Sequence, residues 1–124
     1  MISVPLYQLR ILQEAKCLAT EVYVVTKRFP PSEDRNLTSQ LRRSCVSVVA
    51  NISEGSGRKT KADFCNFISI ARGSARETAA LLALAEDLGF AKKEETAMIR
   101  RRYQGLDAAF HRIINEAERM PLRK

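Results

Sequence analysis

Basic side chains gather at a few places in the 124-residue chain, and the densest group follows a pair of nearby glycines. Arg58, Lys59 and Lys61 come after Gly55 and Gly57, where a helix is expected to begin. The free backbone N–H groups at the start of a helix attract anions, as do lysine and arginine side chains. This loop is therefore the arrangement in the sequence best suited to bind phosphate.

The segment around this loop, EGSGRKT, is superficially similar to a nucleotide-binding P-loop. The P-loop pattern requires a glycine directly before the lysine and another five residues earlier. Arg58 and Ser53 occupy those positions, and a helix rather than a strand is expected before them. Nucleotide hydrolysis is therefore disfavoured.

Further arginines lie on segments with helical periodicity. Arg72 and Arg76 are one turn apart, whereas arginines that are consecutive in the sequence point to different sides of a helix. The candidate nucleic-acid-binding residues are Arg42, Arg43, Arg58, Lys59, Lys61, Arg72, Arg76, Arg100 and Arg101. A charged surface that only keeps the protein soluble is the alternative for any one cluster.

The charge balance favours a polyanionic partner. The net charge is +7, from 21 Lys and Arg against 14 Asp and Glu, and arginine suits phosphate oxygens. With no Trp, three Tyr and five Phe, recognition of shape and backbone is favoured over base stacking. A membrane surface is the rival partner, but no long apolar run, secretory segment or lipidation motif occurs, so we expect a cytoplasmic protein without membrane contact.

Catalytic and metal-binding patterns are absent from the sequence. His111, the single histidine, stands beside the expected core residue Phe110 without a partner that spacing would bring to it. Cys17, Cys45 and Cys65 are odd in number and far apart, which predicts buried reduced thiols, with a three-thiolate metal site across helices as the alternative. We expect no enzymatic activity, no cofactor and no metal.

Prolines and glycines divide the chain into four segments in which apolar residues recur every three to four positions. The expected helices span about residues 6–28, 32–54, 61–88 and 93–119. Apolar and polar residues nowhere alternate with the period of two that is typical of strands, so the sequence predicts an all-α fold. A single domain over residues 1–124, an up-down-up-down four-helix bundle, is the simplest arrangement.

Helix ends are indicated by local signals. The second helix is expected to open with Ser32 as its N-cap, followed by Glu33 and Asp34. The third is expected to begin at Thr60 and to end before Gly89, which supplies the left-handed residue that commonly follows a helix.

Several residues indicate contacts beyond a simple bundle core. Val46 and Val49 project away from the core stripe of the second helix, either as ordinary surface hydrophobes or as a contact between subunits. Gly73, inside the third helix, indicates close approach of another helix from this subunit or a neighbour.

A polar stripe also runs along the second helix. Its members are Gln40, Arg43, Ser47, Asn51 and Glu54. It is either a solvated face or a hydrogen-bonded seam against the third helix, with Arg43 near a carboxylate such as Glu77.

Three motifs carry a family resemblance: LTSQLRR at residues 37–43, NISEGSGR at 51–58 and ARGSARE at 71–77. With them, residues 28–90 resemble the bacterial four-helix-bundle family encoded in intervening sequences of 23S rRNA genes. The resemblance implies a small basic bundle without established enzymatic activity that forms a ring, typically a homopentamer. Such an oligomer gives Val46 and Val49 a role.

A related branch is Avd, the accessory variability determinant of diversity-generating retroelements, a pentameric bundle that binds a reverse transcriptase and RNA. The leading expectation is a non-catalytic, ring-shaped homo-oligomer that binds RNA or another nucleic acid. The alternative is an Avd-like accessory subunit that binds a reverse transcriptase and its template RNA. A structural bundle without any nucleic-acid role is the third possibility.

Overall fold

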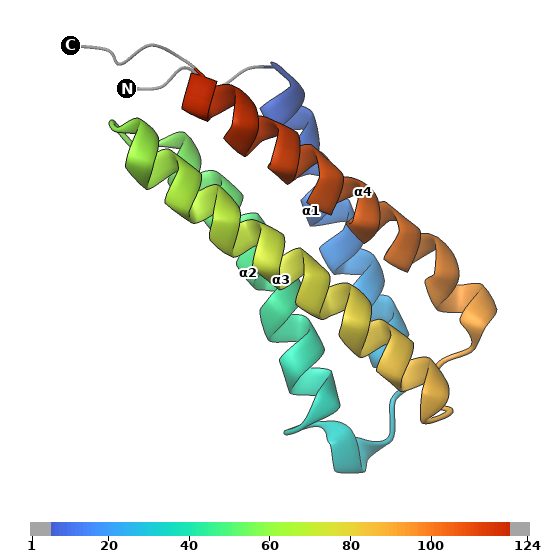
Figure 1. The fold of residues 1–124 in the computed structure, drawn as a ribbon. Coiled ribbons are helices and arrows are strands. Elements are labelled where there is room, and N and C mark those ends of the chain that lie inside the picture. The colour runs from blue at the N-terminus through green and yellow to red at the C-terminus, as the bar shows by residue number, and fades with distance from the viewer. Residues whose placement is uncertain (1–5, 120–124) are drawn as a thin grey trace.

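The computed structural model describes residues 6–119, with side chains from residue 9 onward. Its elements are α1 (Leu6–Thr26), the short 3₁₀ helix η1 (Pro31–Glu33), α2 (Leu37–Ser56), α3 (Lys61–Asp87) and α4 (Lys93–Arg119). The start of α1 and the end of α4 lie at one end of the molecule, and the α1–α2 and α3–α4 connections lie at the other (Figure 1). The predicted all-α four-helix bundle is confirmed, and the described residues form no strand.

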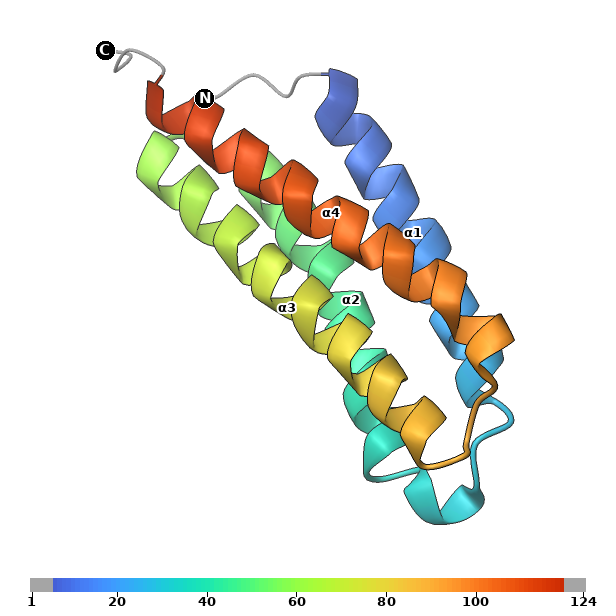
Figure 2. The ribbon, with the colours of Figure 1, turned by 45° about the vertical axis from the view of Figure 1, so that its right-hand side comes forward.

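Each helix contacts its two neighbours in the order α1, α2, α3, α4, with α1 also against α4. The axes of α1 and α4 diverge toward the end where α1 begins (Figure 2). None of the described helices has a stretch long and apolar enough to cross a membrane.

The core is built from one face of each helix. Its largest fully buried apolar side chains are Leu18, Val22, Leu41, Val48, Ile52, Ile68, Leu82, Tyr103 and Phe110. Burial of each such side chain contributes about 1.5–3 kcal/mol, so packing of these faces, more than helix propensity, holds the four helices together.

The three cysteines are free thiols in different environments. Cys45 is fully buried, and burial raises the pKa of its thiol to about 11. Cys65 is partly buried, but Cys17 is exposed, so the prediction that all three thiols are buried was wrong for Cys17. Although exposed, the Cys17 sulfur lies 3.5 Å from Nη2 of Arg102 on α4.

The second helix begins five residues later than expected, at Leu37 instead of residue 32. Pro31–Glu33 forms a separate 3₁₀ turn, and Ser32 caps no helix. The carboxylate of Glu33 instead accepts hydrogen bonds from the Leu37 backbone at 3.3 Å and the Asn36 amide at 3.0 Å. The acidic group thus sits at the positive end of α2, as its charge favours, but from outside the helix.

Both predicted ends of α3 are confirmed. The Thr60 side chain accepts a hydrogen bond from the Asp63 backbone at 3.1 Å. At the other end Gly89 has a φ of 79°. The N–H groups of Gly89 and Phe90 bond to carbonyls of the last turn, which is the Schellman arrangement that terminates a helix.

Helices α2 and α3 lie close together at Gly55. A Cβ atom at this position would lie 3.0 Å from Cβ of Phe67. The absence of a side chain therefore lets the end of α2 rest directly on α3, and it fixes the position of the basic loop that follows.

Candidate nucleic-acid interface

Arg58, the first basic residue of the predicted phosphate loop, is held within the subunit. Its guanidinium carbon lies 4.6 Å from the centroid of the Phe67 ring, and its Nη2 forms an ion pair with Glu54 at 3.0 Å. These contacts direct the cation along the α2–α3 surface. The guanidinium group of Arg58 therefore already interacts with Phe67 and Glu54 in the absence of a ligand.

The rest of the loop is only partly available. Lys59 is exposed, whereas the Nζ of Lys61 lies 3.5 Å from the carbonyl oxygen of Glu118 at the end of α4. One N–H group at the start of α3, that of Asp63, is taken by Thr60. The loop thus offers less to an anion than its sequence indicates.

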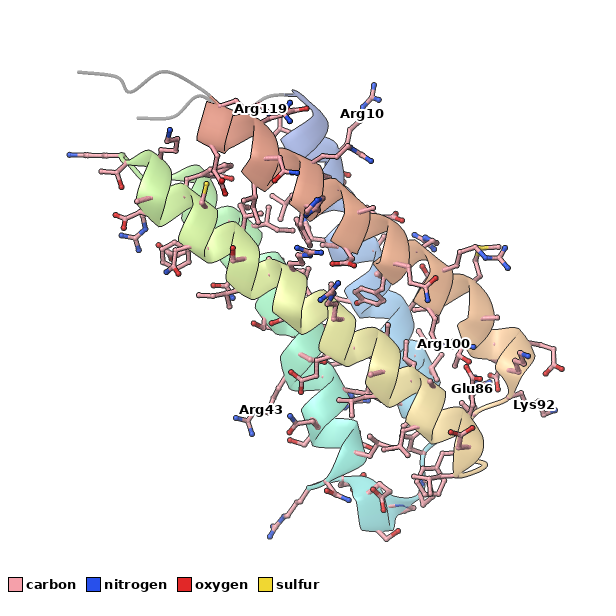
Figure 3. All side chains as sticks on the ribbon, in the orientation of Figure 1. Arg10, Arg43, Glu86, Lys92, Arg100 and Arg119 are labelled. Carbon is pink, nitrogen blue, oxygen red and sulfur yellow. The ribbon has the colours of Figure 1, made fainter. Side chains whose placement is uncertain are left out.

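The two arginines of the LTSQLRR motif have different roles. Arg42 donates to Thr26 Oγ1 at 2.9 Å and lies over the Tyr23 ring, 4.5 Å from its centroid, so it ties α2 to α1. Arg43 is exposed and points away from the bundle (Figure 3). It forms no hydrogen bond or ion pair with any described residue.

Arg72 and Arg76 share one carboxylate across the α3–α4 interface. Their Nε atoms lie 2.6 Å and 3.1 Å from Oδ1 of Asp107. Burial raises the pKa of Asp107, but the hydrogen bonds and charges of the two arginines outweigh that effect and lower it. Arg72 also contacts the His111 ring at 3.4 Å. This cluster acts chiefly as a link between helices.

The three consecutive arginines of α4 separate as their spacing predicts. Arg100 donates to both carboxylate oxygens of Glu86, at 2.8 Å and 3.3 Å, and thereby joins α4 to the end of α3 (Figure 3). Arg101 is exposed and pairs with none of the described residues.

Arg102 joins α4 to α1 by donating to Glu14 and Glu21. Hydrogen bonding to Arg102 lowers the pKa of Glu14 against the opposing effect of burial. Because Arg100 is directed toward α3 and Arg102 toward α1, Arg101 is the one of the three consecutive arginines that faces outward.

Sequence reasoning overlooked three further exposed arginines on α1 and α4. Arg10 on α1, and Arg112 and Arg119 on α4, are exposed and form no ion pair within the described part of the chain. Arg112 follows Arg101 by 11 residues and precedes Arg119 by seven. Arg101, Arg112 and Arg119 therefore lie within about 20° on one side of α4 and span about 27 Å. A helical projection of α4 reveals this stripe from the sequence.

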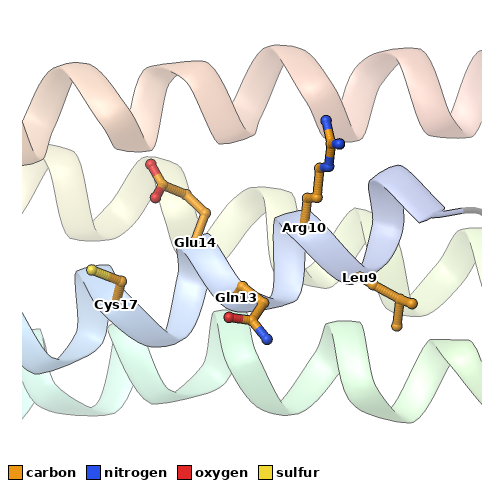
Figure 4. A pocket seen from close by; sticks show the side chains of 5 residues that line it. All are labelled: Leu9, Arg10, Gln13, Glu14 and Cys17. Carbon is orange, nitrogen blue, oxygen red and sulfur yellow. The ribbon is translucent and has the colours of Figure 1, made fainter.

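Arg10 borders the same surface from α1. Figure 4 shows Arg10 and Glu14 on the side of α1 toward α4, at one edge of a shallow pocket that also includes Leu9 and Cys17. We call Arg10, Arg101, Arg112 and Arg119 the arginine face.

A groove between α1 and α4 opens onto the arginine face. It encloses about 440 Å³, with Arg10 and Arg101 among its lining residues. Gly105, Leu106 and Ala109 also line it. Two of these three residues are small, so an approaching backbone can come close to α4 between the two guanidinium groups.

The polar stripe on α2 is a hydrogen-bonded seam along much of its length. Ser47 and Ser74 hydroxyls are 2.8 Å apart, and Gln40 donates to Glu77 at 2.6 Å. The carboxylate expected to bind Arg43 is therefore bound by Gln40, one turn away. This places Arg43 outside the seam.

The predicted interface residues differ in exposure. Val46 is 47% exposed, beside the partly exposed Tyr23. Val49 is partly buried and packs against the core, so the prediction that it faces away from the bundle was wrong. No atom lies within 4 Å of a Cβ built at Gly73, so no described helix of this subunit approaches it closely.

Metal-ligating side chains do not gather in the described region: residues 9–119 contain no cluster of three or more His, Cys, Asp or Glu side chains able to hold an ion.

Comparison with known proteins agrees with the fold and the motifs. No curated protein matches the chain. The crystal structure of a protein of unknown function from the S23 ribosomal protein family of Bacteroides thetaiotaomicron is similar, with a TM-score of 0.76 and 25% identity, over 84% of this chain and 97% of that one. The pattern of the 23S rRNA-intervening sequence proteins matches residues 7–112. The predicted resemblance is thus confirmed: the chain belongs to the family of 23S rRNA-intervening sequence proteins.

Proposed function

We propose that this protein binds structured RNA by its phosphate backbone, through the arginine face. The observation that supports this function is the presence, on adjoining surfaces of α1 and α4, of four exposed arginines that form no ion pair with any residue the structure describes. Most other arginines of the predicted set are engaged by carboxylates or rings within the subunit.

The geometry of the face suits a row of phosphates. An arginine fork can donate two parallel hydrogen bonds to one phosphate. The stripe on α4 spans about 27 Å by helical rise, a length over which a duplex presents many phosphate charges. The α1–α4 groove beside it provides a concave surface into which part of a strand can settle.

The positions of the aromatic side chains disfavour recognition of RNA bases by stacking. Phe29, Phe64, Tyr103 and Phe110 are buried, and the Tyr23 ring is covered on one face by Arg42. Few rings remain on which unpaired bases could stack. Backbone and shape are then the main determinants, and the family's association with rRNA genes favours RNA over other polyanions.

In this proposal the protein binds RNA and does not catalyse a reaction. An RNA partner also implies that the protein acts in the cytoplasm. The ring nitrogens of His111 contact Arg72 and Asn115 instead of a nucleophile. His111 thus lacks the arrangement expected of a general base.

We also infer that the protein self-associates, as the family resemblance implies. Tyr23, Val24 and Val46 are between 38% and 60% exposed on α1 and α2, and burial of such residues between subunits removes apolar surface from water. Val46→Glu should lower the mass measured by light scattering to that of a smaller species while circular dichroism stays helical. An unchanged mass would exclude Val46 from the contact.

A salt titration tests the RNA proposal. Binding of a structured RNA should weaken as salt rises, with a slope of log K against log salt of about −3 to −4 if four phosphates are neutralised. Absence of binding at low salt, or binding without salt dependence, would contradict it.

A further inference from the structure

A further pocket lies between the last turn of α1 and the first turns of α2. It encloses about 420 Å³, within the range of small-molecule sites. It is lined by Tyr23, Asp34, Thr38, Ser39, Arg42, Arg43 and Val46, and two of these residues, Tyr23 and Val46, also belong to the apolar surface from which self-association is inferred. None of the arginine-face residues borders it, so the two sites can be tested separately.

Thr38 carries an unused polar group at this pocket. The residue is only 6% exposed, and its Oγ1 is buried without a hydrogen-bond partner in the described structure. A buried hydroxyl without a partner is unfavourable. Thr38 is one of the lining residues, and because threonine in a helix adopts two χ1 rotamers, its hydroxyl can turn by rotation about the Cα–Cβ bond.

The first turn of α2 offers further donors. The N–H of Leu37 is bound by Glu33, but those of Thr38 and Ser39 have no acceptor among the described residues. Asn36, at the N-cap position, makes no capping hydrogen bond with its side chain. Free N–H groups at a helix start carry partial positive charge and favour an anion.

The charged side chains set the chemistry of the ligand. Arg43 has no partner in the described structure, and Arg42 is bound by Thr26 and Tyr23 but by no carboxylate. Asp34 is the single acid of the lining. Two cations and one carboxylate suit a ligand that has both an anionic group and a hydroxyl donor.

We propose that this pocket binds a phosphate monoester of a nucleotide. Arg43, the Thr38 and Ser39 amides and the Thr38 hydroxyl hold the phosphate, and Asp34 accepts a hydrogen bond from a ribose hydroxyl. The monoester comes either from a free nucleotide or from the 5′ end of an RNA chain. The LTSQLRR motif then supplies the phosphate-binding residues.

Amide chemical shifts give the direct test. Titration with inorganic phosphate and with adenosine 5′-monophosphate should shift the Thr38 and Ser39 amides saturably, with the nucleotide binding more tightly. Arg43→Gln should weaken binding by about tenfold, the effect of losing one charge-assisted contact. Thr38→Val should also weaken it while the fold is retained, because the lost hydroxyl has no hydrogen-bond partner among the described residues. Lys59→Gln, which removes one exposed charge elsewhere, should bind as the parent does.

Absence of saturable shifts, or equal binding by Arg43→Gln or Thr38→Val, would overturn the proposal. To distinguish the two sources of the phosphate, binding is compared for two short RNAs of the same sequence, one with a 5′-phosphate and one with a 5′-hydroxyl. Tighter binding of the 5′-phosphate form, lost in Arg43→Gln, identifies the RNA end. Equal binding of both forms alongside saturable nucleotide binding identifies a free nucleotide.

Discussion

Arg102 of α4 donates two hydrogen bonds to Glu14 of α1, from Nε and Nη2, each of which lies 2.9 Å from a different carboxylate oxygen. The residue directly before it, Arg101, is exposed and pairs with no described residue. Two neighbouring arginines of α4 thus have opposite roles. One holds the α1–α4 contact together, and the other is available to a ligand.

This division predicts different effects of truncation on stability. Arg102→Ala should lower the free energy of unfolding by about 1 kcal/mol, because a partly exposed ion-pair network contributes at the upper end of the range for surface pairs. Arg101→Ala should leave stability unchanged. Urea denaturation of both variants and the parent measures this, and equal destabilisation by the two variants would contradict the assignment.

The interhelical carboxylates predict a loss of stability in acid. The pKa values of Glu14, Glu86 and Asp107 are lowered in the folded protein from ordinary values of 4.5, 4.5 and 3.8. The unfolded chain therefore binds more protons, and the contribution is fully present above about pH 5 and is lost as the pH falls through the lowered folded values. Urea denaturation between pH 6 and pH 3 should show this decline.

Arg102→Met serves as the control for the acid effect, since it removes the main cause of the shift at Glu14. The variant should lose less stability than the parent over the same pH range. If both proteins lost the same amount, the Glu14–Arg102 pair would contribute nothing to the pH dependence.

Two helical glycines predict opposite results on substitution by alanine. Gly55→Ala should destabilise the protein by about 1–3 kcal/mol, because its Cβ would press on Phe67 at 3.0 Å. Gly73→Ala should stabilise the subunit by about 0.5–1 kcal/mol, because the position is open and alanine favours a helix. Thermal denaturation measures both.

Gly73→Ala also tests the contact predicted between subunits at this position. A smaller mass by light scattering, with the helical spectrum retained, would mean that a neighbouring subunit packs closely on Gly73. An unchanged mass together with the expected gain in stability would leave the glycine without an interface role.

The sequence predicted local features well because their causes are local. Thr60 and Gly89 mark the ends of α3 through contacts within a few residues. The start of α2 was misplaced because Ser32 satisfies the local capping rule, whereas Pro31–Glu33 forms a separate 3₁₀ turn and Glu33 bonds to the start of α2 from outside it.

The candidate site was predicted less well because ion pairing depends on tertiary contacts. Arg72 reaches Asp107, 35 residues away, and Arg58, in the loop between α2 and α3, stacks on Phe67 of α3. Neither contact follows from sequence spacing. The stripe from Arg101 to Arg119 does follow from helical periodicity, but it does not stand out in the sequence because its members are dispersed.

The most direct test of the account compares Arg101→Glu/Arg112→Glu with Lys92→Glu/Lys93→Glu. Both double variants change the net charge equally. Lys92 directly precedes α4 and Lys93 is its first residue, and both are exposed, away from Arg112. Affinity for a structured RNA is measured at fixed salt, with helicity and mass confirmed. The arginine variant should bind at least tenfold more weakly than the lysine variant, which should remain near the parent. Equal loss in the two variants would show that net charge alone attracts RNA and would contradict the arginine face as its binding site.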